Sequence, residues 1–223
     1  MFSLEFIYTM LKILFFIVLF SLSARAAINK NWQFLEDKNG ISVYQTKIPG
    51  TKLVGSRGEA IINAPLNRIL FVLSDIDRSF EWVDGLKTSK ILEQNGLLET
   101  VVYQEFNLPW PISNRDFVFR GTAHKEADGR VIIEIKSEDH PLAPKTTGVR
   151  GELIESKYTL TPIGDSQTKL EVEVICDPKG MIPTWLVNLI QKSWPQKTLT
   201  ALMRQLEKPY VVNTVLPKSI EGL

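Results

Sequence analysis

The sequence predicts an α+β domain in which a curved antiparallel sheet wraps around a long C-terminal helix and encloses an apolar cavity. Successive segments alternate apolar and polar residues, which is typical of antiparallel strands with one solvated face. A longer segment near the C-terminus instead has helical periodicity. A helix is an economical cover for the apolar face of a sheet, and the interior between them is a usual place for a small-molecule site.

The first part of the domain combines strands with a short helix. Residues 41–47 alternate as a strand, and residues 53–62 form one or two more. The apolar period then changes, with Leu66, Ile69, Leu70 and Leu73 on one helical face, followed by an irregular helical stretch over 77–83.

Alternation returns after Gly85. It is clearest in four segments: residues 98–106, 117–123, 154–160 and 170–176. Asp128-Gly129 predicts a hairpin turn into a further strand over 131–135. The charged residues that alternate through 152–173 are expected to form the solvated side of the sheet.

The last element is predicted to be a long helix. Residues 177–180 interrupt the strand, and Pro183 lies where a helix can begin. Pro195 is expected to kink or split this helix, and Pro209 to end it. The expected apolar stripe of this helix has two parts. The first is Ile182, Leu186, Leu189 and Ile190, and the second is Leu199, Leu202, Met203 and Leu206.

The N-terminus carries an export signal. Lys12 precedes a short apolar run that ends before Ala24-Arg25-Ala26, a pattern typical of a signal peptide and its cleavage site. We therefore expect a signal peptide over 1–26, a ligand-binding domain over 27–208, a tail over 209–223, and a periplasmic or secreted protein. The alternative is an uncleaved membrane anchor, and Met10 is a second candidate for the start.

Composition argues against several other classes of protein. The chain has 26 basic and 25 acidic residues, so it lacks the charge excess of a nucleic-acid-binding protein. A single cysteine, Cys176, excludes an intrachain disulfide. His124 and His140 have no nucleophile and carboxylate at a recognisable spacing, and no catalytic, phosphate-binding or zinc motif is present. We expect no catalytic residue, metal or cofactor.

Three motifs in order carry a family resemblance. Residues 110–118 read WPISNRDFV, His140-Pro141 is followed by Pro144 and Gly148-Val149-Arg150, and residues 177–183 read DPKGMIP before Leu186-Val187-Asn188. Together they resemble the START lipid-transfer family over about residues 30–208. The resemblance implies a helix-grip fold with a cavity for one lipid or sterol, covered by the C-terminal helix.

The candidate ligand-binding residues are Trp110, Arg115, Ile182, Leu186, Leu189 and Ile190. Trp110 is either a packed loop aromatic or, by the resemblance, a gate residue at the cavity mouth. Arg115 and Asp116 are adjacent, so on a strand they point to opposite faces. Arg115 either anchors the loop to the strand or reaches the ligand's polar head. The helix residues serve as core, cavity lining or both.

The function predicted from sequence is that of a carrier or sensor of one apolar ligand, lipid or sterol-like, gated by the C-terminal helix and the adjacent loop. We expect a monomer with transient membrane contact and no nucleic-acid partner. Two alternatives stay open: a helix-grip enzyme acting on an apolar substrate, and a cell-envelope structural or interaction protein whose cavity is filled by its own side chains.

Overall fold

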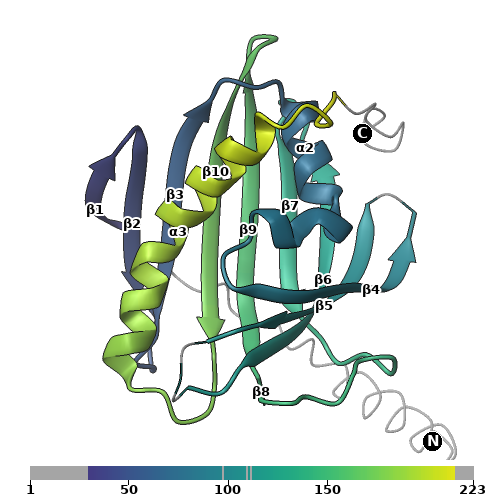
Figure 1. Ribbon diagram of the computed structural model, residues 1–223. Helices are drawn as coiled ribbons and strands as arrows, with labels where there is room; N and C mark the ends of the chain where they lie inside the picture. The colour runs from purple at the N-terminus through teal and green to yellow at the C-terminus, as the bar shows by residue number, and fades with distance from the viewer. Residues whose placement is uncertain (1–29, 97, 109, 111, 214–223) are drawn as a thin grey trace, which may run out of the picture.

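One large sheet and one long helix dominate the computed structural model, which describes residues 30–96, 98–108, 110 and 112–213 (Figure 1). The expected signal peptide over 1–26 lies outside these residues. The strands are β1 (Gln33–Lys38), β2 (Ile41–Lys47), β3 (Val54–Ile62), β4 (Leu86–Asn95), β5 (Glu99–Phe106), β6 (Arg115–Lys125), β7 (Val131–Ser137), β8 (Val149–Arg150), β9 (Glu152–Ile163) and β10 (Gln167–Asp177). The helical elements are α2 (Leu66–Ser74), the 3₁₀ helix η1 (Ile76–Glu81) and α3 (Thr184–Leu206).

The sheet places the last long strand of the chain beside one of the first. Its order is β1-β2-β3-β10-β9-β7-β6-β5-β4, and the neighbours along this path pair antiparallel. The short β8 pairs with β6 in parallel. The last long strand, β10, thus lies beside β3 and directs the chain into α3, which crosses the concave side of the sheet (Figure 1).

The main core lies between α2, the second half of α3 and the sheet beneath them. Leu199 and Leu202 of α3 have no exposed surface and pack with Leu170 of β10, Leu160 of β9 and Ile69 of α2. Burying a side chain of this size stabilises the fold by about 1.5–3 kcal/mol. The α3 C-terminus is also held by Arg68, whose guanidinium donates to the Leu206 carbonyl at 2.9 Å.

The predicted fold class is confirmed, as are the strands, the short helix and the C-terminal helix. Two details refine the sequence-based expectation. Pro195, expected to kink or split the helix, does not split it, because α3 continues through it to Leu206. The edge strands β1 and β4 were not predicted, since β1 is exposed along its length and two bulges break the alternation of β4.

The outer face of the sheet is charged over β3, β9 and β10, as the alternating charges predicted. On this face Arg57 of β3 pairs with Glu171 of β10, and Lys169 lies 3.1 Å from Glu59. Partly exposed pairs of this kind contribute about 0–1 kcal/mol each. Among the helices that the structure describes, none combines the length and apolar character needed to span a bilayer.

Candidate ligand-binding site

The inner face of the sheet beyond the main core is apolar and aromatic. Val102, Phe117 and Phe119 form its buried centre, and partly buried side chains pack around them: Ile76, Phe106, Ile135, Leu153 and Cys176. On β3, β7, β9 and β10 the described residues that share this face are uncharged, as the registers show. A surface of this composition suits hydrocarbon and offers no counter-charge for an ionic ligand.

Two titratable side chains of this face are strongly desolvated. Burial raises the pKa of Tyr158 to about 12. Burial also raises the pKa of Cys176 to about 12, with smaller contributions from the carboxylates of Asp177 and Glu152. Both residues nevertheless keep partly accessible surface. With pKa values near 12, both side chains stay uncharged around neutral pH, in keeping with the apolar character of this face.

Arg115 lies at the start of β6 and is almost fully buried. Its Nε donates to the Pro178 carbonyl at 2.8 Å and its Nη2 to the Lys179 carbonyl at 3.1 Å. Its Nη1 donates to the Ser113 carbonyl. Desolvation lowers the pKa of Arg115. The guanidinium therefore ties the β5–β6 loop (residues 107–114) to the β10–α3 connection (residues 178–183). These contacts are the ones expected if Arg115 anchors the loop.

Asp116 points the opposite way and makes a second tie. The Arg150 guanidinium of β8 donates to its carboxylate at 2.8 Å, and the Val149 amide donates to the Asn114 carbonyl at 3.0 Å. Although burial opposes it, the hydrogen bond from Arg150 holds the pKa of Asp116 below its ordinary value. The three motifs quoted from the sequence thus converge on one corner of the sheet.

The two halves of α3 are packed differently. The second half (residues 195–206) lies in the main core, whereas the first half (residues 184–194) buries Val187 and Gln191. Gln191 Nε2 donates to the Cys176 carbonyl at 2.7 Å, which fastens this half to β10. Two consecutive residues before the helix, Lys179 and Gly180, have φ of 49° and 70°, so the chain turns sharply there.

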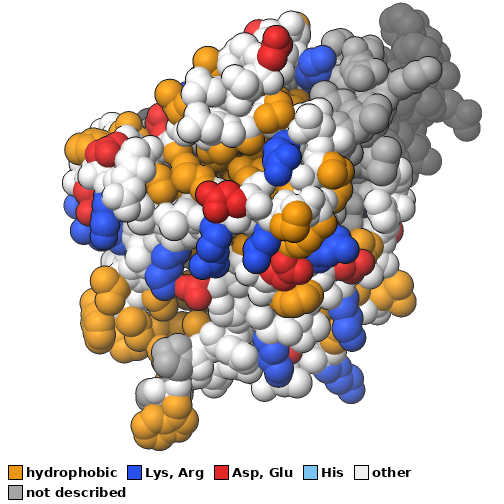
Figure 2. Space-filling view, turned by 45° about the horizontal axis from the view of Figure 1, so that its top comes forward, with side chains coloured by type: hydrophobic (Ala, Val, Ile, Leu, Met, Phe, Trp, Pro, Cys, Tyr) orange, Lys and Arg blue, Asp and Glu red, His pale blue; other side chains and the backbone are white. Residues whose placement is uncertain are grey.

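Apolar side chains are exposed at the same end of the molecule. Trp110 in the β5–β6 loop is 93% exposed, and Trp185 in the first turn of α3 is 68% exposed. Met181 is fully exposed, and Leu189 is 56% exposed. The β5–β6 loop and the β10–α3 connection are neighbours, since Arg115 donates to carbonyls of both segments. We call Trp110, Met181, Trp185 and Leu189 the apolar tip; Figure 2 shows apolar side chains protruding at the lower end of the molecule.

Comparison with known proteins identifies the family. The START domain model matches residues 21–208. The chain belongs to the START domain family. It is 30% identical to an uncharacterized protein of Pseudomonas aeruginosa over 82% of this chain and 90% of that protein. It is also 30% identical to human phosphatidylcholine transfer protein over 75% of this chain and 80% of that protein.

Solved structures agree with the fold of this START domain. A STAR-related lipid transfer protein fragment from Xanthomonas axonopodis superposes with a TM-score of 0.72 and 29% identity, covering 79% of this chain and 99% of that chain. Human STARD10 gives a TM-score of 0.73 over 80% of this chain and 74% of that chain, at 22% identity. The helix-grip fold is therefore established, and with it a general capacity to bind lipid.

The candidate residues of this START domain occupy different environments. Ile182 and Leu186 are partly buried, whereas Leu189 and Ile190 are exposed over about half of their surface, 56% and 42%. The inward stripe runs through Val187, Gln191, Pro195 and Leu199 instead. Gln191 and Pro195 interrupt this stripe, and apolar periodicity in the sequence therefore favoured the face that carries Leu189 and Ile190. The ligand contacts of all six candidates stay predictions.

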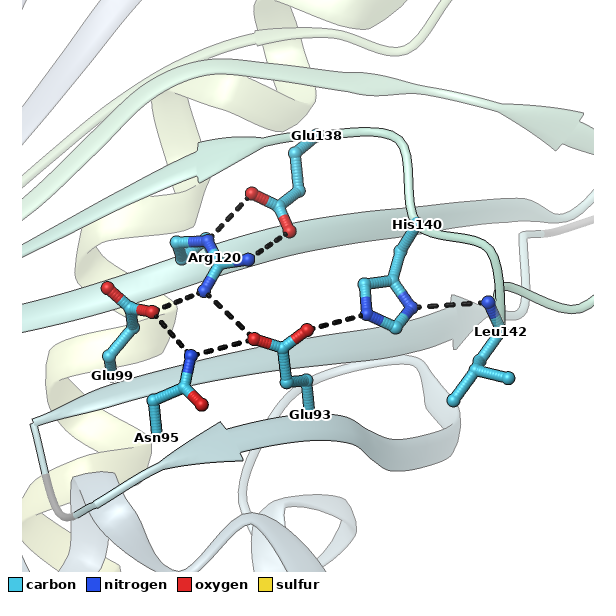
Figure 3. Close-up of polar contacts among 7 residues, drawn as sticks. All are labelled: Glu93, Asn95, Glu99, Arg120, Glu138, His140 and Leu142. Atoms are coloured by element: carbon cyan, nitrogen blue, oxygen red, sulfur yellow. Dashed lines mark hydrogen bonds and ion pairs between the residues drawn. The ribbon is translucent and has the colours of Figure 1, made fainter.

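Both histidines lie on the outer face of the START sheet. His140 Nε2 lies 3.0 Å from the Glu93 carboxylate, within a network centred on Arg120 (Figure 3). His124 lies 3.3 Å from Glu126. Within the described part of the chain, no group of three or more His, Cys, Asp or Glu side chains is arranged to hold a metal ion.

The interior also contains polar residues that the sequence did not single out as site residues. Ser56 of β3 and Gln191 of α3 are both buried. Ser56 belongs to no sequence motif. The only sequence feature that could have pointed to Gln191 is its position one turn before Pro195. Tyr158 was found by alternation, as part of the strand face it shares with Ser156.

Proposed function

We propose that this START domain carries one apolar ligand between membranes in the space under the first half of α3. The observation that carries the proposal is the apolar inner face of the sheet, where Val102, Phe117 and Phe119 form a buried centre and the described residues of β3, β7, β9 and β10 that share the face are uncharged. A chain of roughly a dozen methylenes costs on the order of 10 kcal/mol to expose to water, at about 0.8 kcal/mol each. Enclosure in this space removes that cost during transit.

The gate of this carrier is the first half of α3 together with the β5–β6 loop. The second half of the helix is fixed in the main core, whereas the first half is attached through Val187 and Gln191. Pro195 is the first residue of the second half and lacks the N–H that would bond the Gln191 carbonyl. Movement of the first half would open the interior at the apolar tip.

The apolar tip is the surface that docks on the membrane. Tryptophan favours the boundary between hydrocarbon and water, and both Trp110 and Trp185 protrude at the gate. Docking by the tip would place the opening against lipid, so that the ligand passes without crossing water. The contact is transient and made by a monomer.

The carrier acts outside the cytoplasm. This part of the proposal depends on residues 1–26, whose charge pattern and Ala24-Arg25-Ala26 are typical of a cleaved signal. N-terminal sequencing of protein from an extracytoplasmic fraction should begin near Ala27. A cytosolic species that keeps Met1 or Met10 would overturn the location without affecting the fold.

Native mass spectrometry of protein purified without detergent tests the carrier function. One bound molecule on a monomer, extractable unchanged, supports it. A chemically converted molecule would favour an enzyme, and turnover lost on replacing His124, His140 and Cys176 together would assign it to those groups. A chain that takes up no apolar probe would favour an interaction protein with a filled interior.

The gate has a separate test. A cysteine at residue 112 or 113 is paired with one at 181–186, in a Cys176→Ser background, at a Cβ–Cβ separation of about 3.5–4.5 Å. The oxidised protein should exchange Nile red, a neutral apolar dye, much more slowly than the reduced protein. Equal rates at complete crosslinking would refute the gate and leave the carrier function standing.

A further inference from the structure

Two buried polar atoms face the interior without a hydrogen-bond partner. Ser56 is 0% exposed and its Oγ is unpaired; Gln191 is 6% exposed and its Oε1 is unpaired. A buried polar atom left without a partner costs about 1–3 kcal/mol, so such atoms are normally satisfied by water or by a ligand. Two of them on a side of the sheet whose β3, β9 and β10 residues are uncharged indicate a polar subsite.

The orientation of the Gln191 amide is fixed by its surroundings. Its Nε2 donates to the Cys176 carbonyl at 2.7 Å, and the reverse orientation would place two oxygens against each other. The atom left free is therefore the amide oxygen, which only accepts hydrogen bonds.

Ser56 and Gln191 belong to the same part of the interior. Ser56 is opposite Val174 of β10, two residues before the carbonyl that holds Gln191. Two residues further along β3, Gly58 lies against Pro195, one turn after Gln191 in α3. Both atoms therefore lie beneath the first half of the helix. Asn188, one turn before Gln191, adds another unpaired amide oxygen.

The chemistry of these atoms defines the group that they would bind. Gln191 Oε1 requires a donor, while the Ser56 hydroxyl can donate or accept. A hydroxyl group matches both, because it donates one hydrogen bond and accepts another. A carboxylate or phosphate does not, since it would face the amide oxygen in a region without counter-charge. The nearby cation, Arg115, directs its donors to backbone carbonyls.

We propose that the ligand is an uncharged lipid alcohol whose hydroxyl binds between Ser56 and Gln191, beneath the first half of α3. The proposal rests on the carrier function proposed above. It specifies the chemical class of the ligand and places its polar end under the gate. The hydrocarbon then extends over the face formed by Val102, Phe117 and Phe119.

A matched series of single-chain compounds tests the subsite. Dissociation constants of 1-hexadecanol, hexadecyl methyl ether and hexadecanoate are measured at pH 8 by displacement of Nile red from the delipidated mature protein. The alcohol should bind more tightly than the ether by roughly 5- to 100-fold, which corresponds to about 1–3 kcal/mol. Hexadecanoate, ionised at this pH, should bind more weakly than both.

Ser56→Ala should bring the alcohol and ether affinities to within about threefold, with the ether itself changed little. Ser42→Ala is the control, because this serine donates to Asp37 outside the site. If Ser56→Ala leaves the alcohol preference intact, a structural water occupies the subsite and the proposal fails. Equal binding of alcohol and ether to the wild type, or tighter binding of hexadecanoate, also overturns it while the carrier function stands. Failure of Nile red and of all three compounds to bind would instead overturn the carrier function itself.

Discussion

Gly58 lies where α3 approaches the sheet most closely, and replacing it by alanine tests how the helix is seated. A Cβ at this position would lie 2.7 Å from Pro195 Cβ and 2.9 Å from Leu199 Cδ1. Favourable carbon–carbon contacts lie at about 3.5–4.0 Å, so the helix would have to move by several tenths of an ångström. The proline ring is rigid and Leu199 is fully buried, which leaves little room for local relaxation.

The expected cost of Gly58→Ala is that of overpacking a core, about 1–3 kcal/mol. For a domain of this size, each kcal/mol lowers the melting temperature by about 2–4 °C. Gly121→Ala is the matched control, because a Cβ there meets Ile135 Cγ1 at 3.8 Å and the Thr100 carbonyl oxygen at 4.0 Å, both ordinary van der Waals contacts. We expect Gly121→Ala to be neutral or more stable, by up to about 1 kcal/mol, since alanine restricts the unfolded chain.

Thermal unfolding followed by circular dichroism compares the two variants with the wild type. A second measurement is the rate of Nile red release, which Gly58→Ala should increase because α3 is held less firmly. If Gly58→Ala is as stable as Gly121→Ala and releases the dye no faster, the close seating of the helix is refuted.

Three further predictions concern the anchor, the apolar tip and the buried thiol. Arg115→Lys should lower the free energy of unfolding by about 1–3 kcal/mol, because one ammonium group cannot reach all the carbonyls that the guanidinium joins; an unchanged denaturation midpoint would contradict this. Trp110→Ala and Trp185→Ala should each weaken co-sedimentation with phosphatidylcholine vesicles, while Ile61→Ala, an exposed residue of the outer face, should not. The Cys176 pKa is raised from 9.0 to about 12, so folding favours the neutral thiol: its contribution to stability is complete below about pH 9 and is lost as the pH rises toward 12. Thermal unfolding between pH 8 and 11 should therefore show a smaller loss of stability in Cys176→Ala than in the wild type.

The central strands could be predicted from sequence because each has one apolar and one solvated face. In β10, for example, Leu170 and Val172 alternate with Lys169, Glu171 and Glu173. The edge strands give no such signal. β1 buries none of its residues, and the two bulges in β4 shift the alternation between its faces. Each edge strand forms because it pairs with one neighbouring strand, and a single sequence does not show which segments pair.

The C-terminal helix was predicted, but its orientation about its own axis was not. Helical periodicity selects the face richest in apolar residues, and in the first half of α3 that face includes Leu189 and Ile190. The structure buries Val187 and Gln191 and leaves Leu189 and Ile190 about half exposed. The usual pairing of apolar residues with the interior fails here because one end of the helix carries an exposed apolar surface, which is expected of a surface that meets a lipid or another molecule.

The sequence motifs identified the family and not the ligand, because Arg115, Asp116 and Arg150 in these motifs hold the frame of the fold. Arg115 bonds to carbonyls of the β10–α3 connection, and Asp116 pairs with Arg150, so these motif residues hold the frame and the base of the helix in place. Neither set of contacts restricts which side chains line the inner face. That face can therefore change its polar groups without disturbing the frame, and a pair such as Ser56 and Gln191 can set the chemistry of the ligand while belonging to no motif. In the proposed carrier the choice of ligand would thus depend on the positions where the strands and α3 meet, which only the folded arrangement brings together.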